Sequence, residues 1–488
     1  MRRVLLFAAS SLLLAPWPAA AEWRALQTNH FHVIGDVSAG RLREVALRFE
    51  QFRDVVTQLL PAALRAGSAP VVVIVFPDAR SYRPFMPVAN GRTVPVDGFF
   101  VDGADTNYIT MNVEAGEQAF PVVFHEFSHL LLSSAFARAP LWFNEGLAEY
   151  FSTFEVTADG RSALLGKPIS RHVALLRERR LTLSQLFAIG PDSKEYTREG
   201  IERELLYAQS WALVHYARHA EQRPFASLES LARRLADGEA VNESVRATYA
   251  MDLEALDAEV QAYVRRQVYT HAELSSVDRV VMRVDSEAAI VDAADVDAWL
   301  ADLLAHLQRG PEAIPRLERA LQLRSDHPRA LATLGMLRVR QGNRREGLSL
   351  LERAAAAGPD VESVQFEYGW ALATEDAFDD TRAQQARAAF ERALALRPGY
   401  PAAVQMLASV YGRTGDFSKM RDLLTPLVAA TPDNQDAALQ LAAALLGLGD
   451  FVAVRALVGP ILARPRDNDT RERARTLLAE ISKLQQPR

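Results

Sequence analysis

The first part of the chain alternates between short apolar runs and one long segment with helical spacing. Residues 30–34 alternate as in a half-buried strand, and residues 39–64 carry apolar side chains at intervals of three and four. Residues 71–76 form a continuous apolar run, and residues 108–112 have the composition of a further strand. Short strands interleaved with a helix predict an α/β layer for residues 22 to about 115.

Residues 152 to about 268 have mostly helical spacing. The clearest helical segments are 168–180, 205–220, 225–235 and a long amphipathic run over 241–268. Together with the α/β layer, these helices predict one mixed domain over residues 22–268.

From about residue 293 the chain is rich in alanine, leucine and arginine, and its sequence repeats. Repeat units begin at Pro328, Glu362, Pro401 and Gln435, which are 34, 39 and 34 residues apart. This spacing resembles that of tetratricopeptide repeats, whose period is 34 residues. A weaker unit covers residues 294–327, and the five extra residues of the longer unit fall around 375–384, at the turn between two helices.

An α-solenoid is therefore predicted for residues 293–486, and residues 269–292 are expected to connect the two domains. Each helical hairpin of such an array buries its apolar face only against its neighbours, so the stacked hairpins form a superhelix with a concave groove. We expect a protein partner in this groove, and a purely structural extension is the alternative. The fold class predicted for the whole chain is α/β plus all-α.

The N-terminal segment indicates export. Two arginines precede an apolar run over residues 4–14, and three alanines close residues 1–21, which is the pattern of a cleavable signal peptide. The eleven residues of this run are too few to span a bilayer, and no later segment is predicted to span one. We therefore expect an exported bacterial protein, periplasmic or secreted, with no membrane span after signal cleavage.

Composition narrows the partners and the chemistry. The chain holds 55 basic and 61 acidic residues, a net charge of −6, which becomes −8 once two arginines leave with the signal peptide. Because no basic patch stands out, a nucleic-acid partner is not expected. The sequence contains no cysteine, which excludes a disulfide framework, a cysteine nucleophile and a lipoprotein anchor.

One stretch carries the candidate chemistry of the first domain. Residues 125–129 read His-Glu-Phe-Ser-His, an H-E-x-x-H motif. In a helix His125 and His129 share one face, so both imidazoles can reach one metal ion, while Glu126 leans towards the same cavity. These polar groups are costly to bury in so apolar a helix unless a cation pairs with them. We therefore predict a divalent metal with His125 and His129 as ligands.

A second stretch offers a third ligand. Residues 140–150 predict another helix, with Glu145 and Glu149 four residues apart on one face. Fifteen residues separate His129 from Glu145, enough for the end of one helix, a short turn and the start of an antiparallel partner. Two histidines and one glutamate are a known catalytic zinc set that leaves one position open. We therefore predict one Zn²⁺ per chain.

The two stretches resemble the gluzincin metallopeptidases, the group that contains thermolysin and the aminopeptidase N family, and more closely the peptidase MA-like domains. In these families the zinc glutamate lies in an Asn-Glu-Gly or Asn-Glu-Ala element, which Asn144, Glu145 and Gly146 match. The resemblance implies that Glu145 binds the metal and that Glu149, with Asn144, supports the ligands from behind. The gap after His129 is shorter than in these families, so Glu149 remains the alternative ligand.

The same resemblance implies further roles. The aminopeptidase N family carries a tyrosine at a similar distance beyond its zinc glutamate, and this tyrosine donates a hydrogen bond to the transition state. Tyr207 lies 62 residues beyond Glu145; Tyr196 is a weaker candidate, and a core role is the alternative for Tyr207. In gluzincins, the strand before the metal-binding helix holds an extended peptide by its exposed edge. This role falls here to Tyr108, Ile109, Thr110, Met111 and Asn112, for which a plain sheet strand is the alternative.

These residues predict a function. The chain is expected to be an exported zinc peptidase in which Glu126 acts as general base and Tyr207 stabilises the oxyanion. Its substrate would be a peptide or protein, and the repeats would recruit that substrate or a protein partner. The alternative is a scaffold or assembly factor that acts through the repeat groove and rarely or never turns over.

Overall fold

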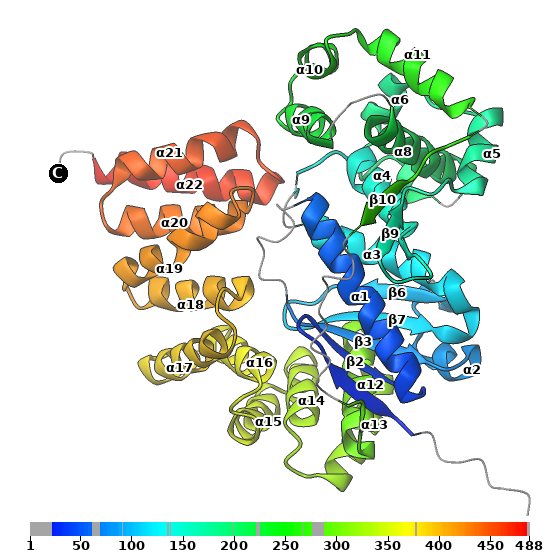
Figure 1. Cartoon of the computed structure of the whole chain (residues 1–488). Helices are drawn as coiled ribbons and strands as arrows, with labels where there is room; N and C mark the ends of the chain where they lie inside the picture. Colours follow the sequence, from blue (N-terminus) through cyan, green and yellow to red (C-terminus); the bar gives the residue numbers. More distant parts are fainter. Residues whose placement is uncertain are drawn as a thin grey trace, which may run out of the picture.

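The computed structural model describes residues 22–60, 69–89, 91–133, 136, 138–198, 200–220, 225–266, 268–275, 287–375 and 378–485. A mixed sheet, a helical half-domain and a long helical array follow one another along the chain (Figure 1). The predicted signal peptide, residues 1–21, lies outside the described residues. Among the described helices, none combines the length and the hydropathy that crossing a bilayer requires.

A six-stranded mixed sheet forms the centre of the first domain. In spatial order its strands are β11 (Ala289–Ile290), β1 (Arg24–Gln27), β2 (Phe31–Gly35), β3 (Val71–Phe76), β7 (Asn107–Asn112) and β6 (Gly98–Val101). The three strands β2, β3 and β7 are parallel, and the flanking strands are antiparallel to their neighbours. Every residue of β3 is buried, as expected for a strand that is covered on both faces.

Short elements lie on either side of β6 and β7 in the chain. They are α2 (Ala79–Tyr82), a 3-10 helix (Arg83–Phe85), β4 (Val88–Ala89), β5 (Arg92–Thr93) and a second 3-10 helix (Val113–Gln118). The first four fill the crossover from β3 to the hairpin of β6 and β7, and the last leads into the helix that carries the H-E-x-x-H motif.

Two helices, α1 (Ala39–Leu59) and α3 (Ala119–Ser133), cover one face of the sheet (Figure 1). Aromatic side chains fill this layer. The rings of Phe52 and Phe124 stack with their centroids 4.3 Å apart, and Phe127 packs into the same cluster. This packing holds α3 in a fixed orientation against the sheet.

The first helices of the repeat array cover the other face of the sheet. They are α12 (Ala293–His306), α13 (Gly310–Leu323) and α14 (Pro328–Arg340). Ile34 and Ile74 of the sheet and Leu303 of α12 belong to one apolar core. The hydroxyl of Tyr108 on β7 donates a hydrogen bond to Asp302 on α12. The array therefore completes the core of the first domain.

The predicted connection, residues 269–292, contributes strands in its described part. β10 (Ala272–Ser275) pairs with β9 (Ser162–Leu165), which also pairs with β8 (Glu155–Val156), and β11 extends the large sheet beside β1. The described residues of this connection therefore pair with strands of two sheets, because cross-strand pairing outweighs their polar composition. Residues 276–286 lie outside the described part of the chain.

The second half of the first domain is helical, as predicted. Its helices are α4 (Leu141–Ser152), α5 (Ser170–Glu178), α6 (Leu183–Ala188), α7 (Lys194–Thr197), α8 (Ile201–His219), α9 (Phe225–Ala236), α10 (Val241–Tyr249) and α11 (Leu253–Val264). The single long helix expected over 241–268 is divided in two. Ala250 ends α10 in the left-handed region, with φ of 55°, and this conformation cannot continue a helix.

The helices of the array begin where the repeats were predicted to start, at Pro328, Glu362, Pro401 and Gln435. After α14 they are α15 (Arg344–Ala357), α16 (Glu362–Ala373), α17 (Asp380–Leu396), α18 (Pro401–Arg413), α19 (Phe417–Ala430), α20 (Gln435–Gly447), α21 (Phe451–Ala463) and α22 (Asn468–Leu484). The weaker unit is the hairpin of α12 and α13. The extra residues of the longer unit lengthen both α17 and the loop before it, as expected near that turn.

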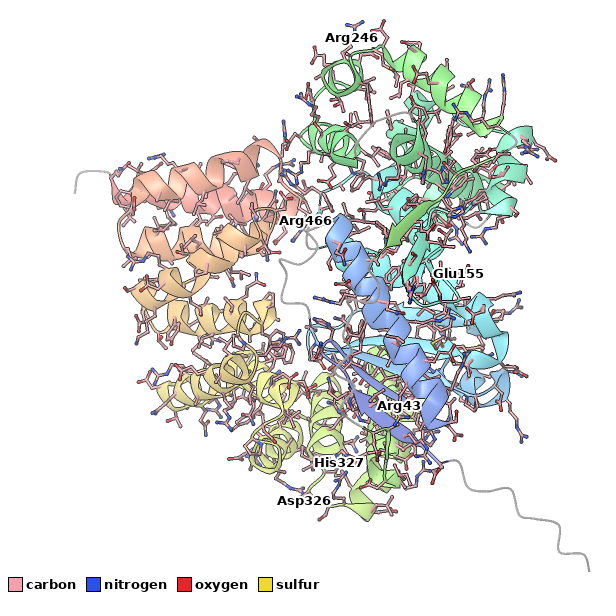
Figure 2. All side chains as sticks on the ribbon, viewed as in Figure 1. Arg43, Glu155, Arg246, Asp326, His327 and Arg466 are labelled. Carbon is pink, nitrogen blue, oxygen red and sulfur yellow. The ribbon has the colours of Figure 1, made fainter. Side chains whose placement is uncertain are left out.

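The array curves alongside the first domain, and its far end meets that domain again (Figure 1). Arg464 pairs with Asp237 at 3.0 Å, and Arg138 pairs with Asp433 at 2.7 Å. Such exposed pairs contribute at most about 1 kcal/mol each, so the apolar contact of α12 with the sheet is the main attachment. Charged side chains elsewhere project outward from the helices, as Arg246 on α10 does (Figure 2).

Candidate metal centre

The helix α3 places the two histidines of the H-E-x-x-H motif on one side. Its opposite side is apolar, and Phe124 and Phe127 are buried there in the aromatic layer. His125 and His129 are one helical turn apart, and their Nε2 atoms lie 3.2 Å from each other. The burial of one side of α3 therefore turns both imidazoles towards the same point.

The helix α4 begins after Pro140 and presents two carboxylates towards α3. Glu145 and Glu149 are buried, with 2% and 3% of their surface exposed. Gly146 lies between them and lets α4 approach α8 closely, because a Cβ atom there would lie 2.5 Å from the Ser210 carbonyl oxygen. The glycine of the Asn-Glu-Gly element thus brings α8 beside the carboxylates.

His125, His129 and Glu145 form a compact triangle, which we call the ligand triangle. Glu145 Oε2 lies 3.4 Å from His125 Nε2 and 3.5 Å from His129 Nε2. A tetrahedral zinc ion with bonds of about 2.0–2.1 Å needs ligand atoms about 3.3–3.4 Å apart. Glu145 Oε2 is also buried without a hydrogen-bond partner among the described residues. Both observations fit three ligands around one metal ion.

The charges of the ligand triangle are strongly coupled. Burial alone would raise the pKa of Glu145, but interactions with His125 and His129 lower it to about 2. Burial would lower the pKa of His125, whereas its contact with Glu145 and the charge of Glu149 raise it. The carboxylate is therefore ionised at neutral pH, as a metal ligand must be.

Glu149 lies on the other side of His125, away from the ligand triangle. Its Oε1 atom is 3.5 Å from His125 Nδ1, and its Oε2 atom is 3.1 Å from His172 Nε2. Burial would raise the pKa of Glu149, but His172, His125 and Arg171 lower it. Glu145 therefore lies within 3.5 Å of the Nε2 atoms of both histidines, whereas Glu149 lies behind His125. Sequence reasoning missed His172 and Arg171, because nothing in the helix 168–180 marks them.

Two tyrosines and Glu126 surround the ligand triangle. The ring of Tyr207 on α8 lies 6.0 Å from the ring of His125, centroid to centroid. Burial and the nearby charge of Glu145 raise the pKa of Tyr196, on α7, to about 12. Burial and the charge of Glu145 also raise the pKa of Tyr207, and the charge of Glu126 acts on both phenols. Tyr196 is therefore closer to the centre than its sequence position suggested.

Asn144 precedes Glu145 on α4, and the Oδ1 atom of Asn144 accepts no hydrogen bond from the ligand triangle. Its Oδ1 atom is buried and, within the described part of the chain, has no hydrogen-bond partner. The support expected from Asn144 is thus not visible in the geometry.

The peptide-binding role expected for residues 108–112 is contradicted. Their strand, β7, is paired with β3 on one side and β6 on the other, and all of its residues are buried. The Tyr108 side chain is hydrogen-bonded to Asp302 on α12, and the Thr110 side chain is hydrogen-bonded to Tyr82. A plain sheet strand is therefore formed by Tyr108, Ile109, Thr110, Met111 and Asn112. The edge strand next to β7 is β6, because β6 and β7 form a hairpin and β6 lies on its outer side; β11 is the edge strand at the opposite side of the sheet.

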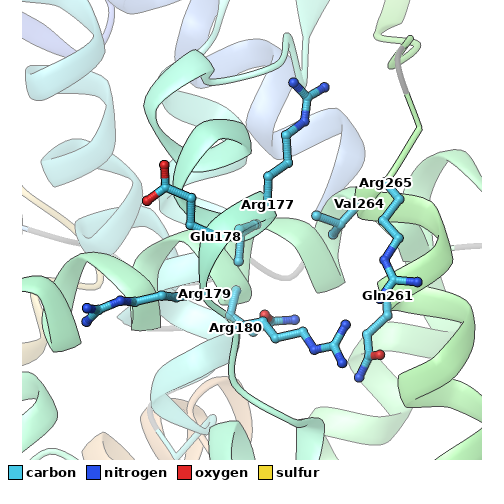
Figure 3. A pocket seen from close by; sticks show the side chains of 9 residues that line it. Arg177, Glu178, Arg179, Arg180, Gln261, Val264 and Arg265 are labelled. Carbon is cyan, nitrogen blue, oxygen red and sulfur yellow. The ribbon is translucent and has the colours of Figure 1, made fainter.

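A cavity of about 790 Å³ lies at the C-terminal end of α5 and contains no residue of the ligand triangle. Figure 3 shows Arg180, Gln261 and Arg265 gathered around it. These arginines follow the C-terminal ends of α5 and α11, where cations interact favourably with the helix dipole. The favourable interaction of these arginines with the helix C-termini accounts for the basic character of this cavity.

Comparison with known families supports both halves of this description. The Peptidase MA superfamily model matches residues 100–266, and a tetratricopeptide repeat model matches residues 304–365. No curated protein matches the chain.

Solved structures similar to this chain are repeat proteins. One is a thermophilic tetratricopeptide repeat protein of Thermus thermophilus, with 22% identity over 38% of this chain and 99% of that chain and a TM-score of 0.30. Another is YrrB, a tetratricopeptide repeat protein with an unusual peptide-binding site, with 16% identity over 38% of this chain and 92% of that chain and a TM-score of 0.33. The two family models identify in this chain a Peptidase MA superfamily domain followed by tetratricopeptide repeats.

Proposed function

We propose that this protein is a zinc-dependent peptidase with a repeat array that recruits a protein. The observation that carries the proposal is the ligand triangle, with sides of 3.2, 3.4 and 3.5 Å, inside a Peptidase MA superfamily domain. Three protein ligands leave one coordination position open, as catalytic sites require. Zinc bound there would supply Lewis acidity that polarises the scissile carbonyl and activates water.

Glu126 is the general base in this proposal. It follows His125 directly on α3 and is only partly buried, so its carboxylate can meet a substrate. Its charge acts on Tyr196 and Tyr207, which supports a common space for the three groups. Glu126 would accept the proton of the attacking water and return it to the leaving amine nitrogen.

The two tyrosines take different tasks. Both have raised pKa values, so both hydroxyls keep their protons at neutral pH and can donate hydrogen bonds. Tyr196 is close enough to Glu145 for that carboxylate to raise its pKa, and we assign it the role of holding the carboxylate in place. Tyr207 would donate to the oxyanion that forms at the scissile carbonyl.

The edge strand β6 is our candidate for the peptide-binding strand. Among the described strands it pairs only with β7, so its outer edge is open to an extended peptide. It also packs closely on α3, since a Cβ atom at Gly98 would lie 3.0 Å from Val123. A peptide added to β6 would therefore run beside the helix that carries His125 and His129.

The repeats and the N-terminus complete the proposal. Tetratricopeptide repeats imply a protein–protein interaction, and we assign them recruitment of a protein substrate or partner. The pattern of residues 1–21 supports export to the periplasm or beyond, with cleavage before Glu22.

Glu126→Gln tests the proposal against the scaffold alternative. The mature wild type, Glu126→Gln and Glu204→Gln would be incubated with peptide libraries, and the products identified by mass spectrometry. Glu204 is an exposed residue of α8 and serves as the matched control. We expect cleavage by the wild type and the control, and none by Glu126→Gln, which should still retain zinc. Cleavage by none of the three proteins, or a cellular function that Glu126→Gln performs as well as the wild type, would favour the scaffold. Equal cleavage by all three proteins would contradict the role of Glu126 as the base.

A further inference from the structure

The loop of residues 102–106, which joins β6 to β7, inserts between helices of the repeat array. The Tyr400 hydroxyl donates a hydrogen bond to the Ala104 carbonyl at 2.6 Å, and Asp105 Oδ1 lies 3.2 Å from His306 Nε2. Gly103 lies against the His306 ring, where a Cβ atom would be 2.9 Å from the ring. The peptidase domain and the array therefore share a closely fitted polar junction.

A cavity of about 230 Å³ lies at this junction, and we call it the junction pocket. It is lined by the loop and by α12, α14 and α16, so neither domain forms it alone. Its walls are mostly apolar, with Met336, Leu337, Phe366 and Trp370 among them. Sites for whole small molecules usually measure about 300–1,000 Å³ and favour domain interfaces. The smaller junction pocket suits a single side chain.

Two carboxylate oxygens in the junction pocket lack donors. Glu367 is 8% exposed, and its Oε2 atom is buried without a hydrogen-bond partner among the described residues. The Oδ2 atom of Asp105 is in the same state. A buried polar oxygen without a hydrogen-bond partner destabilises a fold. Both atoms would therefore be stabilised by a ligand that donates hydrogen bonds.

The neighbouring histidine argues against a metal ion as this ligand. His306 Nδ1 lies 2.9 Å from the Asp302 carbonyl oxygen, and its Nε2 lies 3.2 Å from Asp105 Oδ1. Both partners are acceptors, so both ring nitrogens donate and the imidazole is a cation. A metal ion would need one of these nitrogens free of its proton.

The charges around the junction pocket are consistent with one organic cation. Three carboxylates and two inward cations lie there, namely Asp105, Asp302, Glu367, Arg329 and His306. Burial raises the pKa of Glu367 well above its usual range, so its carboxyl group is neutral in the empty pocket, where two carboxylates balance two cations. When a cation enters and Glu367 gives up its proton, the third carboxylate is balanced by that one added positive charge. Arg340 also lines the pocket, but its side chain is exposed and its charge is screened by solvent.

We propose that the junction pocket binds a lysine side chain of a partner protein. The ammonium group donates to Glu367 Oε2 and Asp105 Oδ2, beside the aromatic walls that favour a cation. The aliphatic stem packs against Met336 and Leu337. Because the loop 102–106 continues into β6, the bound partner also fixes the strand assigned to the substrate; this consequence alone rests on the proposed function.

The test compares two peptides on the full mature protein. The probes are Ac-Ala-Ala-Lys-Ala-Ala-NH2 and the same peptide with norleucine in place of lysine, titrated calorimetrically against wild type, Glu367→Gln and Glu318→Gln. Glu318 is exposed on α13, outside the pocket, and is the matched control. We expect wild type and Glu318→Gln to prefer the lysine peptide about tenfold or more, and Glu367→Gln to lose this preference. No preference in the wild type, or a preference that survives in Glu367→Gln, overturns the proposal.

Two further measurements separate a ligand site from other roles. Glu367→Gln without peptide should unfold at the wild-type temperature or above it, because glutamine keeps the shape of a carboxyl group that burial leaves neutral in the empty pocket; a lower temperature would make Glu367 a structural residue and overturn the proposal. In the His129→Ala background, Zn²⁺ or Mn²⁺ that binds only when Glu367 is present and displaces the lysine peptide would also overturn it. The same background should keep the lysine preference, so failure of the metal centre is distinguishable from failure of the junction pocket.

Discussion

Replacing Glu149 by glutamine tests how much its carboxylate, which lies behind the proposed ligand His125, contributes to metal binding. The side chain is 3% exposed, and its two oxygens lie 3.5 Å from His125 Nδ1 and 3.1 Å from His172 Nε2. Glutamine keeps the shape but removes the charge. His125 then loses the carboxylate that fixes its ring and raises its basicity.

The expected magnitude follows from these distances. Loss of such an outer partner usually costs 10–100-fold in metal affinity. The contact of 3.5 Å with His125 is long for a hydrogen bond, so we expect about tenfold, or about 1.4 kcal/mol. Glu145→Gln removes a ligand of the triangle and should cost more than the upper end of this range.

The assay is competition for zinc with a chromogenic chelator, performed on wild type, Glu149→Gln and Glu145→Gln at neutral pH. Glu178→Gln is the matched control, because Glu178 is exposed near the end of α5. An unchanged affinity in Glu149→Gln would refute the supporting role. A larger loss in Glu149→Gln than in Glu145→Gln would show that the roles of the two glutamates are reversed.

Further predictions concern the tyrosines, a glycine and a histidine. Tyr207→Phe should lower kcat roughly 10²-fold with little change in KM, whereas Tyr196→Phe should mainly weaken the retention of zinc. Steady-state kinetics and metal analysis distinguish the two effects. Identical effects of both substitutions would contradict the separate roles of the two tyrosines. Gly146→Ala should lower the free energy of unfolding by about 1–3 kcal/mol, because the Cβ atom of the alanine would overlap Ser210. Urea denaturation measures this change. An unchanged midpoint would contradict the close approach of α4 and α8. Burial opposes the charge of His306, but neighbouring aspartates raise its pKa from 6.5 to about 10. Its contribution should therefore be full below pH 6.5 and vanish as the pH rises through about 10. Thermal unfolding of wild type and His306→Gln across this range should show a gap that closes with rising pH, and a constant gap would contradict the ion pair.

Local spacing made the chemistry of the chain predictable. His125 and His129 meet because the helical period puts them on one side of α3, and this follows from sequence alone. The repeat starts at Pro328 and Gln435 were predictable for a similar reason, since each hairpin packs only on its neighbours and the period survives in the sequence.

Non-local packing could not be predicted in the same way. In the sheet, β6 lies outside β7 and is an edge strand. No local pattern in residues 98–101 indicates which strand of the hairpin lies at the edge. His172 reaches Glu149 from α5, a contact that depends on how two helices cross. One feature of the sequence did indicate that a further element covers the sheet, where α12 packs. The continuous apolar run of residues 71–76 must be covered on both faces, and α1 and α3 cover only one of them.

The most direct test of the account is the metal content of the purified mature protein. Inductively coupled plasma mass spectrometry would be applied to wild type, His125→Ala and Glu145→Ala. The account predicts about one tightly held zinc per chain in the wild type and its loss in both variants. A wild type without zinc, or a Glu145→Ala protein that keeps it, would contradict the ligand triangle of His125, His129 and Glu145.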